Sequence, residues 1–126
     1  MSDSPSRIEV EIPELAHPQP IPVAVWIKDM LFSSPIGPRR ADGTIPDDVD
    51  EQFDVTFENL DKLLAGAGAE RSSVAIVRVY LDDPSLRDRL NERWVTFFDD
   101  PPPARHVSQN VLPSGARVLL TVVAVR

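Results

Sequence analysis

The chain has 126 residues, a mass of 14.0 kDa and a net charge of −7, from 13 basic and 20 acidic residues. That length is typical of a single domain, and the acidic balance weighs against nucleic-acid partners, which usually need a basic surface. The chain has no cysteine, which excludes disulfides, thiolate metal sites and cysteine nucleophiles.

The sequence carries no targeting or membrane-spanning signal. No apolar run reaches the roughly 18 residues that a membrane span requires, and residues 1–7 lack the basic start and apolar core of a secretory signal. We therefore expect a soluble cytoplasmic protein with no membrane partner. The first few residues are expected to be disordered, in a partly ordered N-terminal segment 1–17 that precedes one domain over residues 18–126.

Thirteen prolines mark where regular structure can form. Proline interrupts helices and central strands, so the proline-free stretches 47–83, 85–100 and 114–126 are the places to expect both. Before them, the alternating residues 7–12 are typical of a short strand. Residues 23–28 and 30–33 are typical of two strands joined near Lys28-Asp29.

The first proline-free stretch predicts a helix followed by a strand. Acidic residues at its start favour a helix N-terminus, and Gly66 and Gly68 favour a C-terminal stop. One apolar stripe at steps of 3 and 4 follows the acids: Val49, Phe53, Phe57, Leu60, Leu63, Leu64 and Ala67. The β-branched residues 74–81 then predict a strand.

The C-terminal part predicts a second helix and two strands. Asp83 and Pro84 are typical of an N-cap and a first helical position, and residues 86–98 form an amphipathic pattern. A short strand is expected at 104–109, and the near-continuous apolar residues 117–125 indicate a central strand buried on both faces. The coarse order β-β-α-β-α-β-β predicts an α+β domain with two helices on one face of a mixed sheet.

Most candidate chemistry has a plainer interpretation. His17 and His106 lie in different proline-rich contexts, so we expect ordinary imidazoles and no metal site. The acids in 47–54 could be paired catalytic carboxylates, but a solvated helix N-terminus explains them better. Trp26 and Trp94 are expected in the core or at an interface.

Arg105 is the strongest candidate for a functional residue. It follows Pro101-Pro102-Pro103-Ala104, so a stiff segment leads directly into a strand that holds a guanidinium. The planar guanidinium matches the geometry of a carboxylate. A small-anion site at Arg105 is one interpretation, and a surface arginine or an interface salt bridge is the other.

Five segments resemble the YjgF/RidA family of reactive-intermediate deaminases, over residues 18 to 126. The Pro102-Pro103-Ala104-Arg105 segment resembles the signature of that family. The other four segments follow the family's order and spacing: Gln52 with Glu58-Asn59-Leu60 and residues 63–68, residues 79–83, the Asn91–Phe98 helix, and Leu112-Pro113 before the last strand.

The resemblance implies a chorismate-mutase-like fold, a homotrimer and clefts between subunits. In the deaminase branch the signature arginine pairs with the substrate carboxylate, and water attacks the carbon of a 2-imino acid formed from an enamine. Ammonia and a 2-keto acid leave, and no cofactor is needed. On this resemblance Arg105 is assigned to carboxylate binding and catalysis, and Val107, two residues further along the strand, to the substrate site.

Three cleft positions depart from the family. Ile21 stands where the family has a tyrosine, and Pro35 stands beside the retained Ser34. Thr121 replaces the glutamate credited with orienting the attacking water, and a threonine hydroxyl can hold water but is no base near neutral pH. Arg78 replaces a small or neutral residue and would add a second cation.

Three functions therefore remain open. The first is hydrolytic deamination of small 2-imino or enamine carboxylates, with an altered substrate and Thr121 and Ser34 holding water or the substrate's polar end. The second is a catalytically weak trimer that binds small carboxylates. Ribonuclease activity is disfavoured, because the chain is acidic and lacks an acid–base histidine pair.

Overall fold

The computed structural model describes residues 6–126, so the predicted disorder of the first few residues lies partly outside its range. It contains one mixed sheet of six strands in the order β1-β2-β3-β6-β4-β5. The strands are β1 (Ile8–Val10), β2 (Ala24–Ile27), β3 (Met30–Ser33), β4 (Val74–Leu81), β5 (Ala104–Gln109) and β6 (Val118–Val125). Only β4 and β5 pair in parallel, and all other neighbours are antiparallel.

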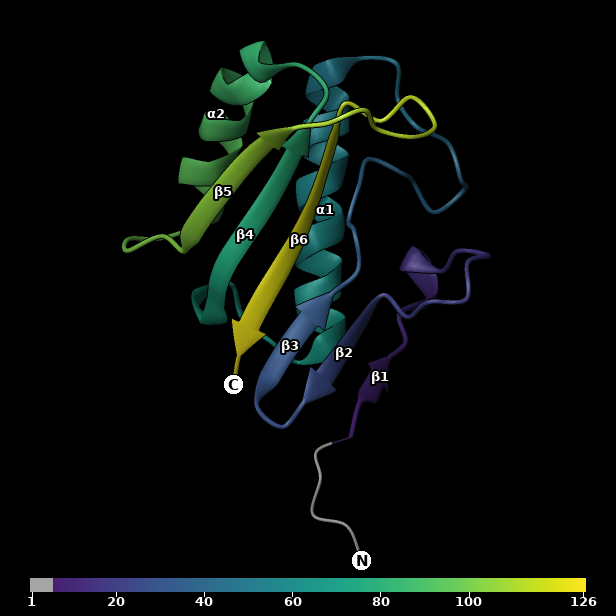
Figure 1. Ribbon diagram of the computed structural model, residues 1–126, viewed down its shortest axis with the longest axis vertical. Helices are drawn as coiled ribbons and strands as arrows, with labels where there is room; N and C mark the ends of the chain where they lie inside the picture. The colour runs from purple at the N-terminus through teal and green to yellow at the C-terminus, as the bar shows by residue number, and fades with distance from the viewer. Residues whose placement is uncertain (1–5) are drawn as a thin grey trace, which may run out of the picture.

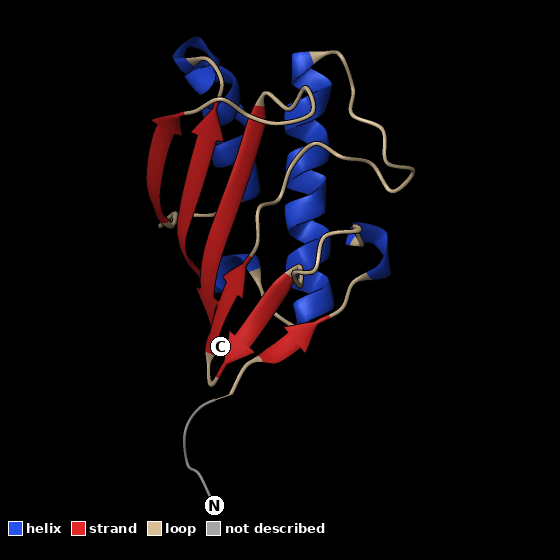
Figure 2. Ribbon diagram, turned by 45° about the vertical axis from the view of Figure 1, so that its right-hand side comes forward, coloured by secondary structure: helices blue, strands red, loops and turns tan. Residues whose placement is uncertain are grey.

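Two helices, α1 (Val49–Ala67) and α2 (Arg87–Phe97), cover one face of this sheet (Figures 1 and 2). The predicted α+β fold, with two helices on one side of a mixed sheet, is confirmed. Short 3₁₀ turns at Pro13–Leu15, Arg71–Ser73 and Pro84–Leu86 join the elements. Neither helix within residues 6–126 has the length and apolar character that crossing a bilayer requires.

The helix ends follow the sequence signals. The Asp48 side chain caps α1 by accepting a hydrogen bond from the Glu51 backbone N–H, which satisfies a donor that the first helical turn leaves free. Gly68 ends α1 in the left-handed conformation, with φ of 75°, where glycine has no Cβ to clash. Asp83 caps the turn that leads into α2, as predicted.

The short strand expected within residues 7–12 is present as β1, which pairs with β2 in antiparallel register. The structure therefore has three strands before α1, where the coarse order counts two. The boundary proposed after residue 17 stays a prediction. Lys28 takes the positive-φ position of the turn between β2 and β3, where the sequence predicts that these two strands join.

The core lies between the sheet and the two helices. In β6, alternate residues are fully buried against the helices: Val118, Leu120, Val122 and Ala124. β6 is central, as predicted, but its other face is only half-buried in a single chain, so the prediction of burial on both faces is wrong for one copy.

The sheet face away from the helices is apolar over β2, β3 and β6. Phe32 pairs with Val25 on one side and Val123 on the other, which places all three on this face. Met30, Phe32 and Val125 keep 43%, 39% and 42% of their surface exposed. An apolar patch of this kind on a sheet is typical of a protein interface.

Candidate functional site

Arg105 lies near the start of β5, the strand at one edge of the sheet. Its register partner in β4 is Val77, which is buried under the helices, so Arg105 points to the helix-covered face. Its guanidinium carbon lies 4.9 Å from the centre of the Trp94 ring of α2. This stacking holds the guanidinium plane in place through a cation–π contact.

The surroundings of Arg105 are electropositive. Burial lowers the pKa of its guanidinium below the ordinary value, and the positive charge of Arg87 lowers that pKa further. The ordinary pKa of arginine is so high that the group stays charged at neutral pH. A half-buried cation beside a second cation is poorly solvated, which favours the binding of an anion.

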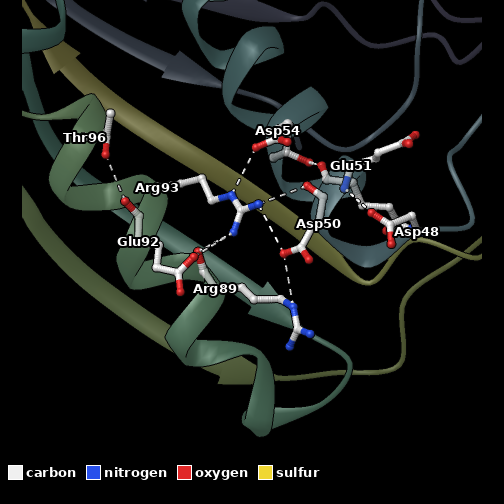
Figure 3. Close-up of polar contacts among 10 residues, drawn as sticks. Asp48, Asp50, Glu51, Asp54, Arg89, Glu92, Arg93 and Thr96 are labelled. Carbon is white, nitrogen blue, oxygen red and sulfur yellow. Dashed lines mark hydrogen bonds and ion pairs between the residues drawn. The ribbon is translucent and has the colours of Figure 1, made fainter.

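Within residues 6–126, neither Arg105 nor Arg87 donates a hydrogen bond to another residue or forms an ion pair with an acidic side chain. Two other arginines of α2 behave differently. Arg89 and Arg93 both contact Asp50 at 3.2 Å, and Arg93 also contacts Asp54 at 3.1 Å (Figure 3). The donors of Arg105 therefore remain available for a ligand.

The same contacts explain the acidic residues at the start of α1. Asp48 is the helix cap, and Asp50 and Asp54 are ion-paired to α2. Glu51 contacts Arg40 at 3.0 Å. The predicted helix N-terminus is confirmed, and each of these four acids is held by a cap hydrogen bond or an ion pair.

A second group of predicted site residues lies away from Arg105. Ile21 and Ser34 line a cavity of about 380 Å³, together with Pro35 and the side chain of Asn59. The Ser34 hydroxyl donates to the Pro22 carbonyl at 2.7 Å, so it fixes the loop that carries Ile21. Ile21 keeps 50% of its surface exposed at this cavity.

Thr121 and Arg78 lie on the open face of the sheet. They are register partners across β6 and β4, and Arg78 is in turn the register partner of His106 in β5. Arg105 points to the opposite face. In one chain, Arg78 therefore adds no charge to the Arg105 site, and Thr121 does not face the guanidinium.

One chain thus holds two separate half-sites. Arg105 and Val107 share the helix-covered side of β5, with Val107 packed partly against the core. Ser34 follows β3, which lies three strand spacings, about 14 Å, from β5 in the sheet order. A single chain does not bring Ile21, Ser34 and Thr121 to Arg105.

The remaining sequence candidates are structural. Trp26 is 4% exposed and its indole N–H donates to the Ala67 carbonyl at 3.1 Å, while Trp94 is 8% exposed. Both tryptophans are in the core, as expected. His17 is half-buried and accepts a hydrogen bond from the Gln19 backbone N–H. His106 is exposed on β5, next to Arg105 in the chain.

Sequence reasoning missed Arg87 as a neighbour of Arg105. The signal was present, because Arg87, Asn91 and Trp94 are spaced i, i+4 and i+7 and so share one face of α2. That face carries the tryptophan that stacks on Arg105. Recognising it required knowing that α2 packs beside β5.

Comparison with known proteins assigns the class. The family model described as "Endoribonuclease L-PSP" matches residues 15–126. A RutC family protein of Aquifex aeolicus is 32% identical over 123 residues, covering 94% of this chain and 98% of the relative. The chain belongs to the YjgF/RidA family.

Two further relatives are informative. The 2-iminobutanoate/2-iminopropanoate deaminase of Rattus norvegicus is 31% identical over 101 residues, covering 79% of this chain and 74% of the enzyme. The crystal structure of TdcF from E. coli with bound serine has a TM-score of 0.88 and 26% identity, covering 94% of this chain and 98% of that one.

Proposed function

We propose that the protein hydrolyses small 2-imino carboxylates, and their enamine tautomers, to 2-keto acids and ammonia. The observation that carries the proposal is Arg105, which is stacked on Trp94 and bonded to no protein group within residues 6–126. The name of the rat relative, a deaminase of 2-iminobutanoate and 2-iminopropanoate, supports the same chemistry.

Arg105 would bind the substrate carboxylate through two parallel N–H donors. This contact fixes the C=N group relative to the protein, and orientation of this kind lowers the barrier to attack by water. The water oxygen adds to the imine carbon while the nitrogen takes up a proton. The remaining hydroxyl proton then passes to the nitrogen as the C–N bond breaks, so that ammonia leaves and the carbon–oxygen bond becomes the carbonyl of the 2-keto acid.

The complete site would form between copies of the chain in a homotrimer. The apolar open face, with Phe32 and Val125 exposed, supports such an assembly because its burial would remove apolar surface from water. In this arrangement Arg105 and Val107 of one copy meet Ile21, Ser34 and Thr121 of the next. Thr121 would hold the attacking water through its hydroxyl.

Sedimentation velocity tests the assembly. Wild type is expected to sediment as a trimer, and Phe32→Asp is expected to shift it to monomer, because the new carboxylate would be buried at the interface. Val95→Asp is the control, since Val95 is an exposed apolar residue on α2, away from that face. A monomeric wild type contradicts the assembly.

Ammonia release from freshly generated 2-iminopropanoate and 2-iminobutanoate tests the chemistry. Wild type is expected to accelerate it, and Arg105→Ala to reduce kcat/KM at least a hundredfold. Arg7→Ala is a matched control, since it removes an exposed arginine that lies outside both the Arg105 half-site and the cavity of Ile21 and Ser34. Acceleration that survives in Arg105→Ala contradicts the assigned role.

A catalytically weak carboxylate-binding trimer is the second candidate. Thr121 favours this candidate, because it stands where the family has a glutamate and its hydroxyl does not supply the base that a glutamate provides. A protein that accelerates no imine but shows a melting temperature raised by 2-oxobutanoate, in an Arg105-dependent way, would belong to this class.

Ribonuclease activity is not part of the proposal, because the net charge of −7 disfavours RNA binding. No cofactor is required by the chemistry proposed above. The cytoplasm is the proposed location, and fractionation of cells that express the protein would test it.

A further inference from the structure

The cavity that Ile21 and Ser34 line has a largely apolar wall. Its volume is about 380 Å³, and none of the described residues that line it is acidic. Six apolar residues border it: Leu15, Ile21, Pro35, Pro38, Ile45 and Leu119. Small-molecule sites in proteins are typically apolar hollows of about 300–1,000 Å³ with few polar groups, so this cavity has the size and lining of a ligand pocket.

Asn59 and Ser34 bring polar atoms to the cavity wall, but both side chains are already bonded to protein groups. The amide nitrogen of Asn59, which is 5% exposed, donates to the carbonyls of Gly37 and Arg39 at 2.8 Å each. The Ser34 hydroxyl donates to the Pro22 carbonyl. These bonds fix the loop around the cavity and leave mainly apolar surface for a ligand.

Leu119 is held at the cavity by the chain that follows β3. The backbone of Ile36 exchanges two hydrogen bonds with Leu120, at 2.7 and 2.8 Å, so this segment runs beside β6 (Figure 1). Gly37 lies so close to Leu119 that a Cβ at Gly37 would come within 2.5 Å of the leucine Cδ2. Leu119 thus forms a fixed part of the wall. It lies on the same face of β6 as Thr121, about 7 Å away along the strand.

We propose that this cavity receives the side chain of the substrate, and that the protein prefers 2-imino acids with large apolar side chains. Ile21 and Leu119 are the specificity-determining residues. The inference rests on the proposed function for the imine and on the proposed assembly for the approach of Arg105 from a second copy. Arg105 would hold the carboxylate, Thr121 would lie beside the imine carbon, and the cavity would enclose the side chain.

The volume of the cavity favours a side chain larger than the ethyl group of 2-iminobutanoate. Each carbon of an ethyl group is about as large as a water molecule, which takes up about 30 Å³ in the liquid. The ethyl group would therefore fill only a small part of the cavity. An apolar cavity of about 150 Å³ already accepts a benzene ring. A branched or aromatic side chain buries more apolar surface, and each further buried CH₂ strengthens binding about fourfold.

Stable 2-keto acids test the preference without requiring turnover. Calorimetry on the full-length protein would give the Kd of 4-methyl-2-oxopentanoate, 2-oxosuccinamate and 2-oxobutanoate. The side chains of the first two ligands have the same size and branching but differ in polarity, and the third is apolar but smaller. Wild type is expected to bind 4-methyl-2-oxopentanoate at least tenfold more tightly than either of the others.

Four variants locate the preference, measured as the affinity for 4-methyl-2-oxopentanoate divided by that for 2-oxosuccinamate. Ile21→Asn and Leu119→Asn keep the size of the side chain but make it polar, and each is expected to lower this ratio at least fivefold. Ile8→Asn is the matched control, because Ile8 is 60% exposed on β1 and does not line the cavity. Arg105→Gln is expected to weaken all three ligands and leave the ratio unchanged. Ile21 is an exposed loop residue, so its variant tests the inference even where Leu119→Asn fails to fold.

Three results would overturn the inference. The first is a ratio near one in wild type, or absence of binding by all three keto acids. The second is a ratio that Ile21→Asn leaves unchanged or that Ile8→Asn lowers equally. The third is tighter binding of 2-oxoglutarate than of 4-methyl-2-oxopentanoate that Arg39→Gln abolishes, because Arg39 is an exposed cation at the cavity and the pocket would then select a charged side chain.

Ammonia release from 2-imino-4-methylpentanoate and 2-iminobutanoate separates this inference from the proposed function. If neither imine is accelerated but the keto-acid ratio depends on Ile21, deamination is wrong and the apolar pocket stands. If both imines are accelerated with no preference that depends on Ile21, deamination stands and the apolar pocket is wrong.

Discussion

Replacing Gln52 with leucine is expected to destabilise the protein strongly, because this side chain bonds three separate backbone groups. Gln52 is 2% exposed. Its amide nitrogen donates to the Pro46 carbonyl at 2.9 Å and to the Gly115 carbonyl at 3.1 Å, and its oxygen accepts from the Arg117 N–H at 2.7 Å. It thus joins α1 to the loop that precedes α1 and to the loop that precedes β6.

Leucine fills a similar volume but makes none of these bonds. Leaving a buried polar group without a partner costs about 1–3 kcal/mol each. Two of the three bonds are only partly buried, so we expect a total loss of about 3–5 kcal/mol. That is a large share of the roughly 5–15 kcal/mol that stabilises a domain.

Urea denaturation at one fixed protein concentration measures this loss. Gln19→Leu is the matched control, because Gln19 is exposed and its side chain makes no hydrogen bond within residues 6–126. The control is expected to change the free energy of unfolding by less than about 0.5 kcal/mol. A loss below about 1 kcal/mol in Gln52→Leu would mean that the three hydrogen bonds contribute little to stability.

Three smaller effects follow from local structure. Asp48→Ala removes the cap of α1 and is expected to cost about 1 kcal/mol in urea denaturation; no change would mean that water replaces the cap. Gly68→Ala forces alanine into a positive-φ conformation and is expected to cost about 1 kcal/mol in the same measurement, whereas a gain would contradict the left-handed cap. Hydrogen bonds from Thr44 lower the pKa of the Asp42 carboxyl, so Thr44→Val is expected to raise that pKa in an NMR titration. Because the folded pKa is lowered, this contribution to stability is present above the ordinary pKa and disappears as the pH falls through the folded value.

The sequence predicted most of the elements because proline and glycine delimit them. The strand bounds at 74–81 and 104–109 agree with β4 and β5, since Pro84 and Pro103 allow neither strand to extend. Gly68 ends α1 at the predicted place. Gly66 instead lies inside α1, where the side chain of Ile12 packs against it.

The relation between the site residues could not be predicted from local patterns. Thr121 lies in an apolar run in which both faces of β6 are apolar, so the pattern does not show which face it occupies. Its position opposite to Arg105 depends on the non-local order β3-β6-β4-β5 and on which face the helices cover. The resemblance placed these residues in one cleft, and in a single chain they are two half-sites.

Mixed trimers test most directly the claim that these half-sites join between copies. Arg105→Ala disables one half-site, and Ile21→Arg blocks the cavity of the other. Each variant alone is expected to be inactive towards 2-iminobutanoate. Refolding them together in equal amounts should restore about a quarter of wild-type activity, because random assortment around a threefold axis pairs two intact halves at about one site in four.

Recovery of about a quarter of the activity is expected if each site joins two copies of the chain. A mixture as inactive as its two components would mean that each site lies within one chain, because every copy then carries one defect.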